Sequence, residues 1–548
     1  GRPYRAGMRR IIVVTALVCA CAKGTSSSGG AVDSDADAGS VAPDAGGGVP
    51  SGGDAGTDGG TTAAAPIPGA ELIDPNGQYV HAISPDNTRV LLSHHLIAWT
   101  YTAGGFVPGT GDLVVATRGG AIKQLAAEGV WYGAFTNDGS AVVYRTQPHG
   151  VTLVHTDGSN PRQLTTQDEF TLAGRWLYYT DARNGQLALF RLAPPDGDPE
   201  LVAGVPDPST GPLTSGISYW TSPDGDLVVF CHGTPWTCSL VPAASKSPIE
   251  FAGSGASWQF SPDSNWVLNG CDLYDRNGAV RRVCDVIGWL AATFSPDGKL
   301  AIFDARATRV ITLASMAETQ LPPFSEALFY PWGFTPDGSR LIASASDSTG
   351  RPAKFFVANA AGGQWIELSN DAYSQKGASD FPVGLAISPD SRIVATSSRS
   401  QGVVESIAGG PAQVVTHSGD PLFFATPVFE PAGGHGKAIF YERGYPDYRL
   451  ALGNADGSGG WIELGTANFY PRWFGHSFLS FLAGAHDSST RSTAYDILVT
   501  TDDGALTNAP FLSNVSPVFF DQSVDHAALY FTPPSGGLYR GAVPQPAP

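Results

Sequence analysis

The sequence predicts an all-β fold, a β-propeller built from repeated four-stranded blades. Three observations predict it. A Ser-Pro-Asp-Gly turn recurs between apolar segments, successive modules are separated by about 44 residues, the length of a propeller blade, and no amphipathic helix of comparable length is evident. Short apolar stretches rich in β-formers on both sides of each turn are typical of buried strands.

The repeated turn has the chemistry of a type I turn. Ser or Thr stands first, Pro sets φ at the second position, Asp stands third, and Gly often stands fourth. Asn replaces Pro in the last of these copies: Ser84-Pro85-Asp86, Ser222-Pro223-Asp224, Ser261-Pro262-Asp263, Ser295-Pro296-Asp297, Thr335-Pro336-Asp337, Ser388-Pro389-Asp390 and Thr136-Asn137-Asp138.

Degenerate modules continue the period near Trp176, Ala438, Phe478 and Ala528, which brings the total to about eleven. A single ring usually has four to eight blades. We therefore expect two tandem propellers, residues 66–323 and 324–548, with an alternative boundary near residue 375. The segment 70–73 is expected to pair with the last blade, since residues 538–541 lack an obvious outer strand.

Residues 79–545 resemble the TolB-like propellers, whose blades carry an apolar residue, Ser-Pro-Asp-Gly and then an apolar strand. The resemblance implies the fold. It does not imply a ligand, because the same blade occurs in binding proteins, periplasmic scaffolds and the gating domains of prolyl-oligopeptidase-type peptidases. A Gly-x-Ser-x-Gly nucleophile motif is absent from the folded region.

The N-terminal region reads as an export signal. Residues 1–20 combine an upstream extension with a signal peptide, in which Arg9 and Arg10 precede an apolar run. The segment 18–21, Val-Cys-Ala-Cys, resembles a bacterial lipobox, so Cys21 is expected to carry the lipid. Ordinary signal cleavage and use of Cys19 are the alternatives. Residues 21–65, rich in Gly, Ala, Ser and Asp, predict a disordered acidic tether.

The net charge and the cysteine content bear on the kind of partner and on disulfide formation. The net charge is −18 and no basic stripe interrupts the acidic surface, which argues against nucleic acid as a partner. Four cysteines follow the signal, and we expect local disulfides between Cys231 and Cys238 and between Cys271 and Cys284. Other pairings, or four free thiols, are the alternatives.

Few residues point to chemistry, and we expect no cofactor, metal site or catalytic residue. The repeated aspartates cap their own turns and are dispersed around the ring, so we interpret them as structural: Asp86, Asp138, Asp224, Asp263, Asp297, Asp337 and Asp390. Aromatic side chains near loop tips could hold a peptide or a glycan, because flat rings offer contact area at low entropy cost. The best candidates are Tyr219, Trp220, Tyr330 and Trp332.

These features favour an exported, lipid-anchored propeller that acts as a non-catalytic binding or scaffold protein in the bacterial cell envelope, periplasmic or at the outer membrane. Its partner is expected to be an envelope protein or a glycan, with membrane contact through the lipid only. The alternative is a propeller enzyme, a polysaccharide lyase or hydrolase, with its site at the central channel. We expect the binding surface among the divergent C-terminal blades.

Overall fold

A computed structural model provides the structure of the chain. The residues it describes are 70–95, 100–102, 105–107, 110–146, 150–167, 169–183, 186–204, 217–232, 237–242, 248–251, 258–284, 291–303, 308–323, 329–346, 352–368, 384–397, 402–409, 411–417, 420–421, 428–430, 436–442, 448–459, 462–467, 472–474, 477–483, 495–501, 512–515, 520–522, 528–531 and 537–542. The expected signal peptide, Cys21 and the tether lie outside these residues. Within them, no helix is long and apolar enough to cross a membrane.

The described part of the chain forms antiparallel sheets of the propeller type. Six sheets have four strands, one has five, and the seven- and eight-stranded sheets each combine two neighbouring units, so that the described residues form eleven blades. In the seven-stranded sheet, one long strand, β7 (Ile122–Phe135), ends one blade and begins the next. This count agrees with the module count from the sequence.

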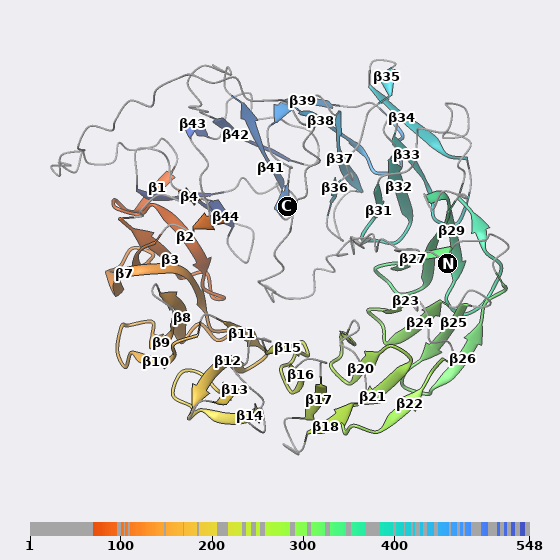
Figure 1. Ribbon diagram of the computed structural model, residues 1–548. Coiled ribbons are helices and arrows are strands. Elements are labelled where there is room, and N and C mark those ends of the chain that lie inside the picture. The colour runs from red at the N-terminus through yellow and green to blue at the C-terminus, as the bar shows by residue number, and fades with distance from the viewer. Residues whose placement is uncertain are drawn as a thin grey trace, which may run out of the picture.

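In every blade except the last, the strands run in chain order from the channel to the rim, and in the last blade the outermost strand is β1 (Figure 1). The innermost strands are β2 (Tyr79–Ile83), the second half of β7, β11 (Phe170–Ala173), β15 (Ser218–Thr221), β19 (Trp258–Phe260), β23 (Ala291–Phe294), β27 (Phe329–Phe334), β31 (Gly384–Ile387), β36 (Val428–Phe429), β40 (Arg472–Phe474) and β44 (Phe520–Gln522). The second strands are β3 (Arg89–His94), β8 (Ala141–Thr146), β12 (Trp176–Arg183), β16 (Leu227–His232), β20 (Trp266–Asn269), β24 (Lys299–Phe303), β28 (Arg340–Ser346), β32 (Ile393–Ser397), β37 (Lys437–Glu442), β41 (Ser477–Ala483) and β45 (Ala528–Phe531).

The third strands are β6 (Gly111–Thr117), β9 (Val151–His155), β13 (Gln186–Leu192), β17 (Thr237–Pro242), β21 (Asp272–Asp275), β25 (Thr308–Thr312), β29 (Pro352–Asn359), β33 (Gly402–Ser406), β38 (Tyr448–Asn454), β42 (Tyr495–Thr501) and β46 (Leu538–Ala542). The outermost strands are the first half of β7, β10 (Arg162–Thr165), β14 (Glu200–Gly204), β18 (Ile249–Phe251), β22 (Val280–Arg282), β26 (Ala317–Gln320), β30 (Ile366–Glu367), β34 (Gln413–His417), β39 (Ile462–Ala467), β43 (Leu512–Val515) and β1 (Ala70–Asp74). A small pair, β4 (Thr100–Thr102) and β5 (Gly105–Val107), and the short β35 (Asp420–Pro421) lie outside this scheme.

The core lies between neighbouring blades. Where side chains are described, the second and third strands are mostly buried, and large apolar side chains from adjacent sheets interdigitate there, as do Val143 and Leu153 of one blade with Leu177 and Phe190 of the next. The innermost strands are mostly half-buried instead, as the pattern along β19 shows. A blade therefore buries its middle and leaves its inner edge partly accessible from the channel.

The ring closes through the first and last strands. β1 supplies the outer strand of the last blade by pairing with β46, with Ala70 opposite Gly541, and the first blade packs on the last through a cluster that joins Val80 and Leu92 to Tyr530 and Leu538. This pairing is the closure expected from the sequence.

The blades follow one another around a single ring (Figure 1), which differs from the expected division into two propellers. Apolar packing continues across both expected boundaries. Phe303 and Phe334 share one cluster across residue 323, and Val357 and Val394 share another across residue 375. The physical reason is that each blade offers an apolar face on both sides, so a following blade extends the ring wherever its own face is apolar.

Candidate functional site

The repeated turns are closed by their own side chains. The first Ser or Thr donates its hydroxyl hydrogen to the Asp carboxylate in all seven copies, for example Ser222 Oγ to Asp224 Oδ1 at 2.6 Å. The same hydroxyl accepts the backbone N–H of the strand that follows, here Leu227 at 2.9 Å. The fourth residue has a positive φ, 73° at Gly225, which explains why glycine is frequent there.

Five of the seven turn carboxylates have a lowered pKa, which favours the ionised form: Asp86, Asp138, Asp224, Asp263 and Asp337. The Ser84 hydroxyl makes the largest contribution to lowering the pKa of Asp86. For Asp138, Asp224 and Asp337, partial burial is the largest single influence and acts to raise the pKa, but hydrogen bonds from hydroxyl and backbone groups together outweigh it and the pKa is lowered. The geometry is that of turn caps, and among the described residues no group of three or more His, Cys, Asp or Glu side chains could hold a metal ion.

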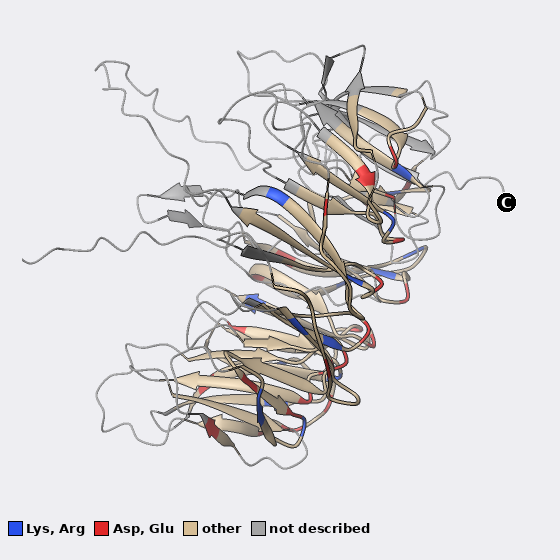
Figure 2. Cartoon of the chain, turned by 90° about the vertical axis from the view of Figure 1, so that its right-hand side faces the viewer, with Lys and Arg blue, Asp and Glu red and all other residues tan. Residues whose placement is uncertain are grey.

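Most charged residues drawn in Figure 2 lie along one side of the ring. Several of them tie one blade to the next. Arg276 Nη2 lies 2.7 Å from both Asp224 and Asp226 of the preceding blade, and Arg89 donates to the carbonyl of Gly139 at 2.8 Å. These charges hold neighbouring blades together.

Both expected cysteine pairs are disulfide-bonded in the structure. Cys231 and Cys238 face each other across β16 and β17 with a Cα–Cα distance of 4.0 Å. Cys271 and Cys284 join the start of β21 to the chain after β22 across 5.0 Å. Each bond therefore lies within one blade and closes a short loop.

The four candidate aromatic residues have different surroundings. Tyr219 packs between two blades, its hydroxyl lies 3.2 Å from Thr171 Oγ1, and burial raises its pKa. Trp332 contacts Phe355 and donates from Nε1 to Ser344 Oγ at 3.0 Å. The side chain of Tyr330 lies outside the described residues. Trp220 differs, because it is 42% exposed although it belongs to an innermost strand.

Trp220 also breaks the pattern of its own repeat. It stands two residues before the turn serine, and the corresponding residues of the other marked blades are smaller: Ala82, Ala134, Gln259, Thr293, Gly333 and Ala386. Alternation along a strand turns this position away from Tyr219 and Thr221, so the indole faces the following blade. A side chain larger than the position usually accepts remains partly exposed at the inner edge of the ring.

The wall formed by the innermost strands is aromatic and nearly uncharged. Every innermost strand except β31 carries at least one Phe, Tyr or Trp, and the only charged residues in these described strands are Arg472 and Asp521. The strand residue His81 lies 2.7 Å from Ser93 Oγ, and burial lowers its pKa to about 3, so its imidazole is neutral. The described innermost strands therefore contain no cluster of carboxylates of the kind that a channel enzyme would need.

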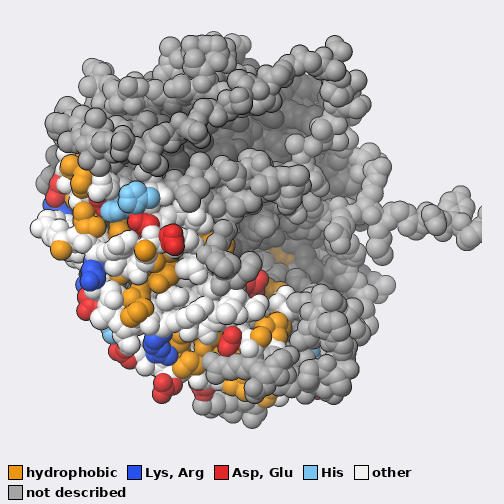
Figure 3. All heavy atoms as spheres, turned by 60° about the vertical axis from the view of Figure 1, so that its left-hand side comes forward, with side chains coloured by type: hydrophobic (Ala, Val, Ile, Leu, Met, Phe, Trp, Pro, Cys, Tyr) orange, Lys and Arg blue, Asp and Glu red, His pale blue; other side chains and the backbone are white. Residues whose placement is uncertain are grey.

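Two further histidines bind separate carboxylates. His94 lies 2.6 Å from the buried Asp74 of β1, while His95 turns outward and lies 2.9 Å from Asp112. β3 ends at His94, and the positive φ of 49° at His95 turns the chain there. Figure 3 shows histidine side chains beside acidic ones at the surface of this part of the ring. No local sequence signal predicts the Asp74–His94 pair, because Asp74 belongs to the outermost strand of the last blade and His94 to the second strand of the first.

Comparisons with known proteins add little to this geometry. No protein-family model and no curated protein matches the sequence. Solved structures that resemble the chain include a eukaryotic initiation factor, with a TM-score of 0.40 and 11% identity over 77% of this chain and 95% of that one. The tricorn protease has a TM-score of 0.29 and 10% identity over 84% and 56%. TolB from Acinetobacter baumannii has 0.21 and 16% over 60% and 76%.

Proposed function

We propose that this protein is an exported, lipid-anchored β-propeller of the bacterial cell envelope, which binds a protein or glycan partner without catalysing a reaction. Trp220 carries the proposal. It is a large, exposed aromatic side chain on the inner wall of the ring, at a position that other blades fill with small residues. Exposed Trp side chains are frequent anchors of binding sites, because a rigid ring contributes a large contact area.

Export is supported by independent features. The signal-like segment, the lipobox resemblance at Cys21 and the acidic tether all precede the ring in the sequence. Two disulfides lie within the ring, and such bonds persist in oxidising compartments. Labelling with radioactive palmitate tests the anchor: incorporation should be lost in Cys21→Ala, and retained labelling of that variant would contradict lipidation at this residue.

The binding role is tested with Trp220→Ala. This change installs the residue that other blades carry at the same position, so the fold should persist. We expect envelope proteins or glycans retained on the immobilised wild-type protein to be lost with Trp220→Ala. They should remain with Leu201→Ala, which removes a 57% exposed side chain from the outer strand β14. If Trp220→Ala retains the same partners as the wild type, the inner wall at Trp220 is not the binding surface.

A further inference from the structure

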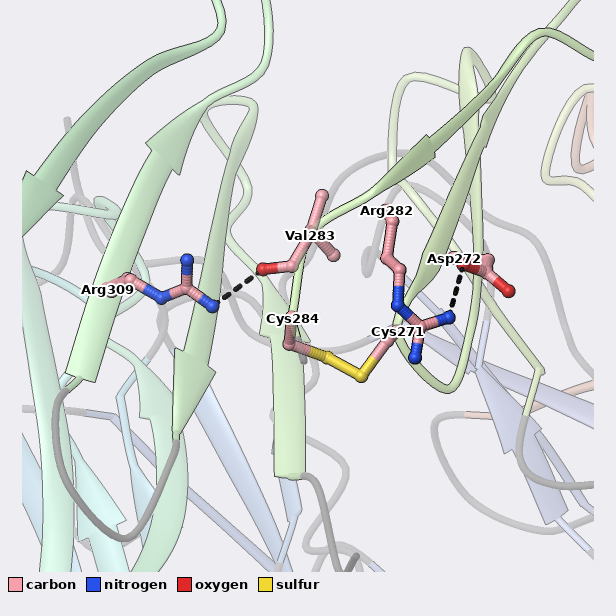
Figure 4. The surroundings of a disulfide bond; sticks show 6 residues. All are labelled: Cys271, Asp272, Arg282, Val283, Cys284 and Arg309. Atoms are coloured by element: carbon pink, nitrogen blue, oxygen red, sulfur yellow. Dashed lines mark hydrogen bonds and ion pairs between the residues drawn. A yellow bond between two sulfur atoms is a disulfide. The ribbon is translucent and has the colours of Figure 1, made fainter. Parts of the chain in front are cut away.

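An arginine-lined notch lies on the outer part of the ring, between the blades that contain β22 and β25. It encloses about 150 Å³ and is lined by Arg281, Arg282, Val283 and Cys284 on one side and by Arg309, Ile311 and Glu318 on the other. Figure 4 shows four of these lining residues, Arg282, Val283, Cys284 and Arg309, around the Cys271–Cys284 disulfide. The notch is independent of the proposed binding surface at Trp220.

Strand register directs the two main arginines into the notch. Arg281 pairs with Leu273, so it shares the face of β22 that packs toward the next blade. Arg309 is two residues before Ile311, whose side chain packs in the same interblade cluster. Alternation along each strand therefore brings both guanidinium groups to the same side. Arg282 also lines the notch, but its guanidinium group pairs with Asp272 at 3.3 Å, so its charge is balanced.

The charges in the notch are not balanced. Arg309 donates to the Val283 carbonyl at 2.7 Å and lies 3.3 Å from Glu318. Arg281 is exposed, and Glu318 is the only acidic side chain among the described residues that line the notch. One positive charge is thus left over in a protein whose net charge is −18. A local cationic site of this kind attracts anions despite the acidic surface, because charges farther away than about 10 Å are screened by salt.

We infer that the notch binds an oxyanion, a phosphate or sulfate group held between Arg281 and Arg309. The guanidinium group presents two parallel N–H donors that match the oxygens of such a group. The volume accommodates one group of this size with its first waters, and the group replaces the missing negative charge beside Arg281. Cys284 in the wall makes the shape of the notch dependent on the disulfide.

Titration of the full chain with inorganic phosphate at about 0.1 M ionic strength, followed by calorimetry, tests the inference. Arg281→Gln should weaken phosphate binding at least tenfold, and Glu318→Gln should strengthen it about threefold by removing a like charge. The matched controls Arg392→Gln and Glu367→Gln make the same charge changes at exposed ion pairs elsewhere, and both should bind as the wild type does. Equal affinity of Arg281→Gln and Arg392→Gln would overturn the inference.

The source of the oxyanion is distinguished by a second measurement. Vesicles of phosphatidylcholine with and without phosphatidylglycerol are sedimented with the protein after removal of its lipid anchor by Cys21→Ala. If the protein sediments only with the vesicles that contain phosphatidylglycerol, and Arg281→Gln abolishes this sedimentation, the notch binds a lipid phosphate. If the protein binds inorganic phosphate but sediments with neither kind of vesicle, the oxyanion comes from a soluble molecule or a glycan.

Discussion

The contribution of β1 to ring closure can be tested by replacing one carboxylate, that of Asp74. Asp74 is fully buried at the end of β1, accepts the N–H of Asn76 at 2.9 Å and lies 2.6 Å from His94 Nε2. Replacing it with Ala removes both contacts. Because hydrogen bonds to a charged group contribute about 1.5 to 3 kcal/mol each, the closure should lose about 3 kcal/mol.

Hydrogen exchange measures this loss where it occurs. A loss of 3 kcal/mol in local opening corresponds to roughly a hundredfold faster exchange of the amides that pair β1 with β46. Blades far from the closure, such as the one containing β16, should exchange at the rate of the wild type. The effect on β46 is informative because this strand is separated from Asp74 by almost the whole sequence.

Glu71→Ala is the matched control on the same strand. Its carboxylate is 42% exposed and lies 3.5 Å from Arg118 and 3.9 Å from Arg540. Exposed ion pairs contribute less than about 1 kcal/mol, so exchange should rise no more than about fivefold. If Asp74→Ala leaves the exchange of β1 and β46 at the level of this control, the buried carboxylate does not hold the ring closed.

Three further predictions concern the blades themselves. Asp86, Asp138 and Asp224 of the turns have lowered pKa values in the folded state, so their stabilisation is complete above about pH 4 and is lost as the pH falls through the folded pKa. Thermal midpoints should therefore be level from pH 7 to about pH 5 and fall below pH 4, less steeply in Asp138→Asn; a midpoint unchanged down to pH 2 would contradict this. Replacing Cys271 and Cys284 together with Ala should cost about 3 kcal/mol in urea unfolding, whereas identical unfolding of the oxidised wild type and this variant would show that the bond does not constrain the chain. Ser264→Ala removes the hydroxyl that accepts the Asp224 N–H at 3.0 Å and should cost about 1 kcal/mol; Ser264→Gly should cost less, because the residue has a φ of 59°, and the reverse order in thermal unfolding would refute the reasoning.

Local features of the fold are visible in the sequence. Each Ser-Pro-Asp turn encodes its own hydrogen bonds, and the strands on both sides are short and apolar, so the blades could be located and counted. The number of rings could not be predicted this way. It depends on how Phe303 packs on Phe334 and how Val357 packs on Val394, contacts between blades that no local motif determines.

The candidate sites were predicted less completely. Tyr219 and Trp220 are neighbours in the sequence, and only the direction of the strand decides which is buried and which is exposed. Trp220 is among the four aromatic residues that the sequence indicates, and alignment of the repeats by their turns would have distinguished it from the other three, since the equivalent residues are small. Arg281 and Arg309 carry no comparable signal, because the notch forms only when two blades are packed together. In the C-terminal blades, where the sequence favoured a binding surface, most side chains lie outside the described residues.

The position of β1 has a mechanical consequence. Any pull on the residues that precede Ala70 is transmitted to the ring first through the pairing of β1 with β46. Asp74 and its contact with His94 lie at the opposite end of β1 from the point of loading. Among the described elements, β1 is therefore the first to bear such a force, and Asp74 is the residue of this strand that lies farthest from the point of loading.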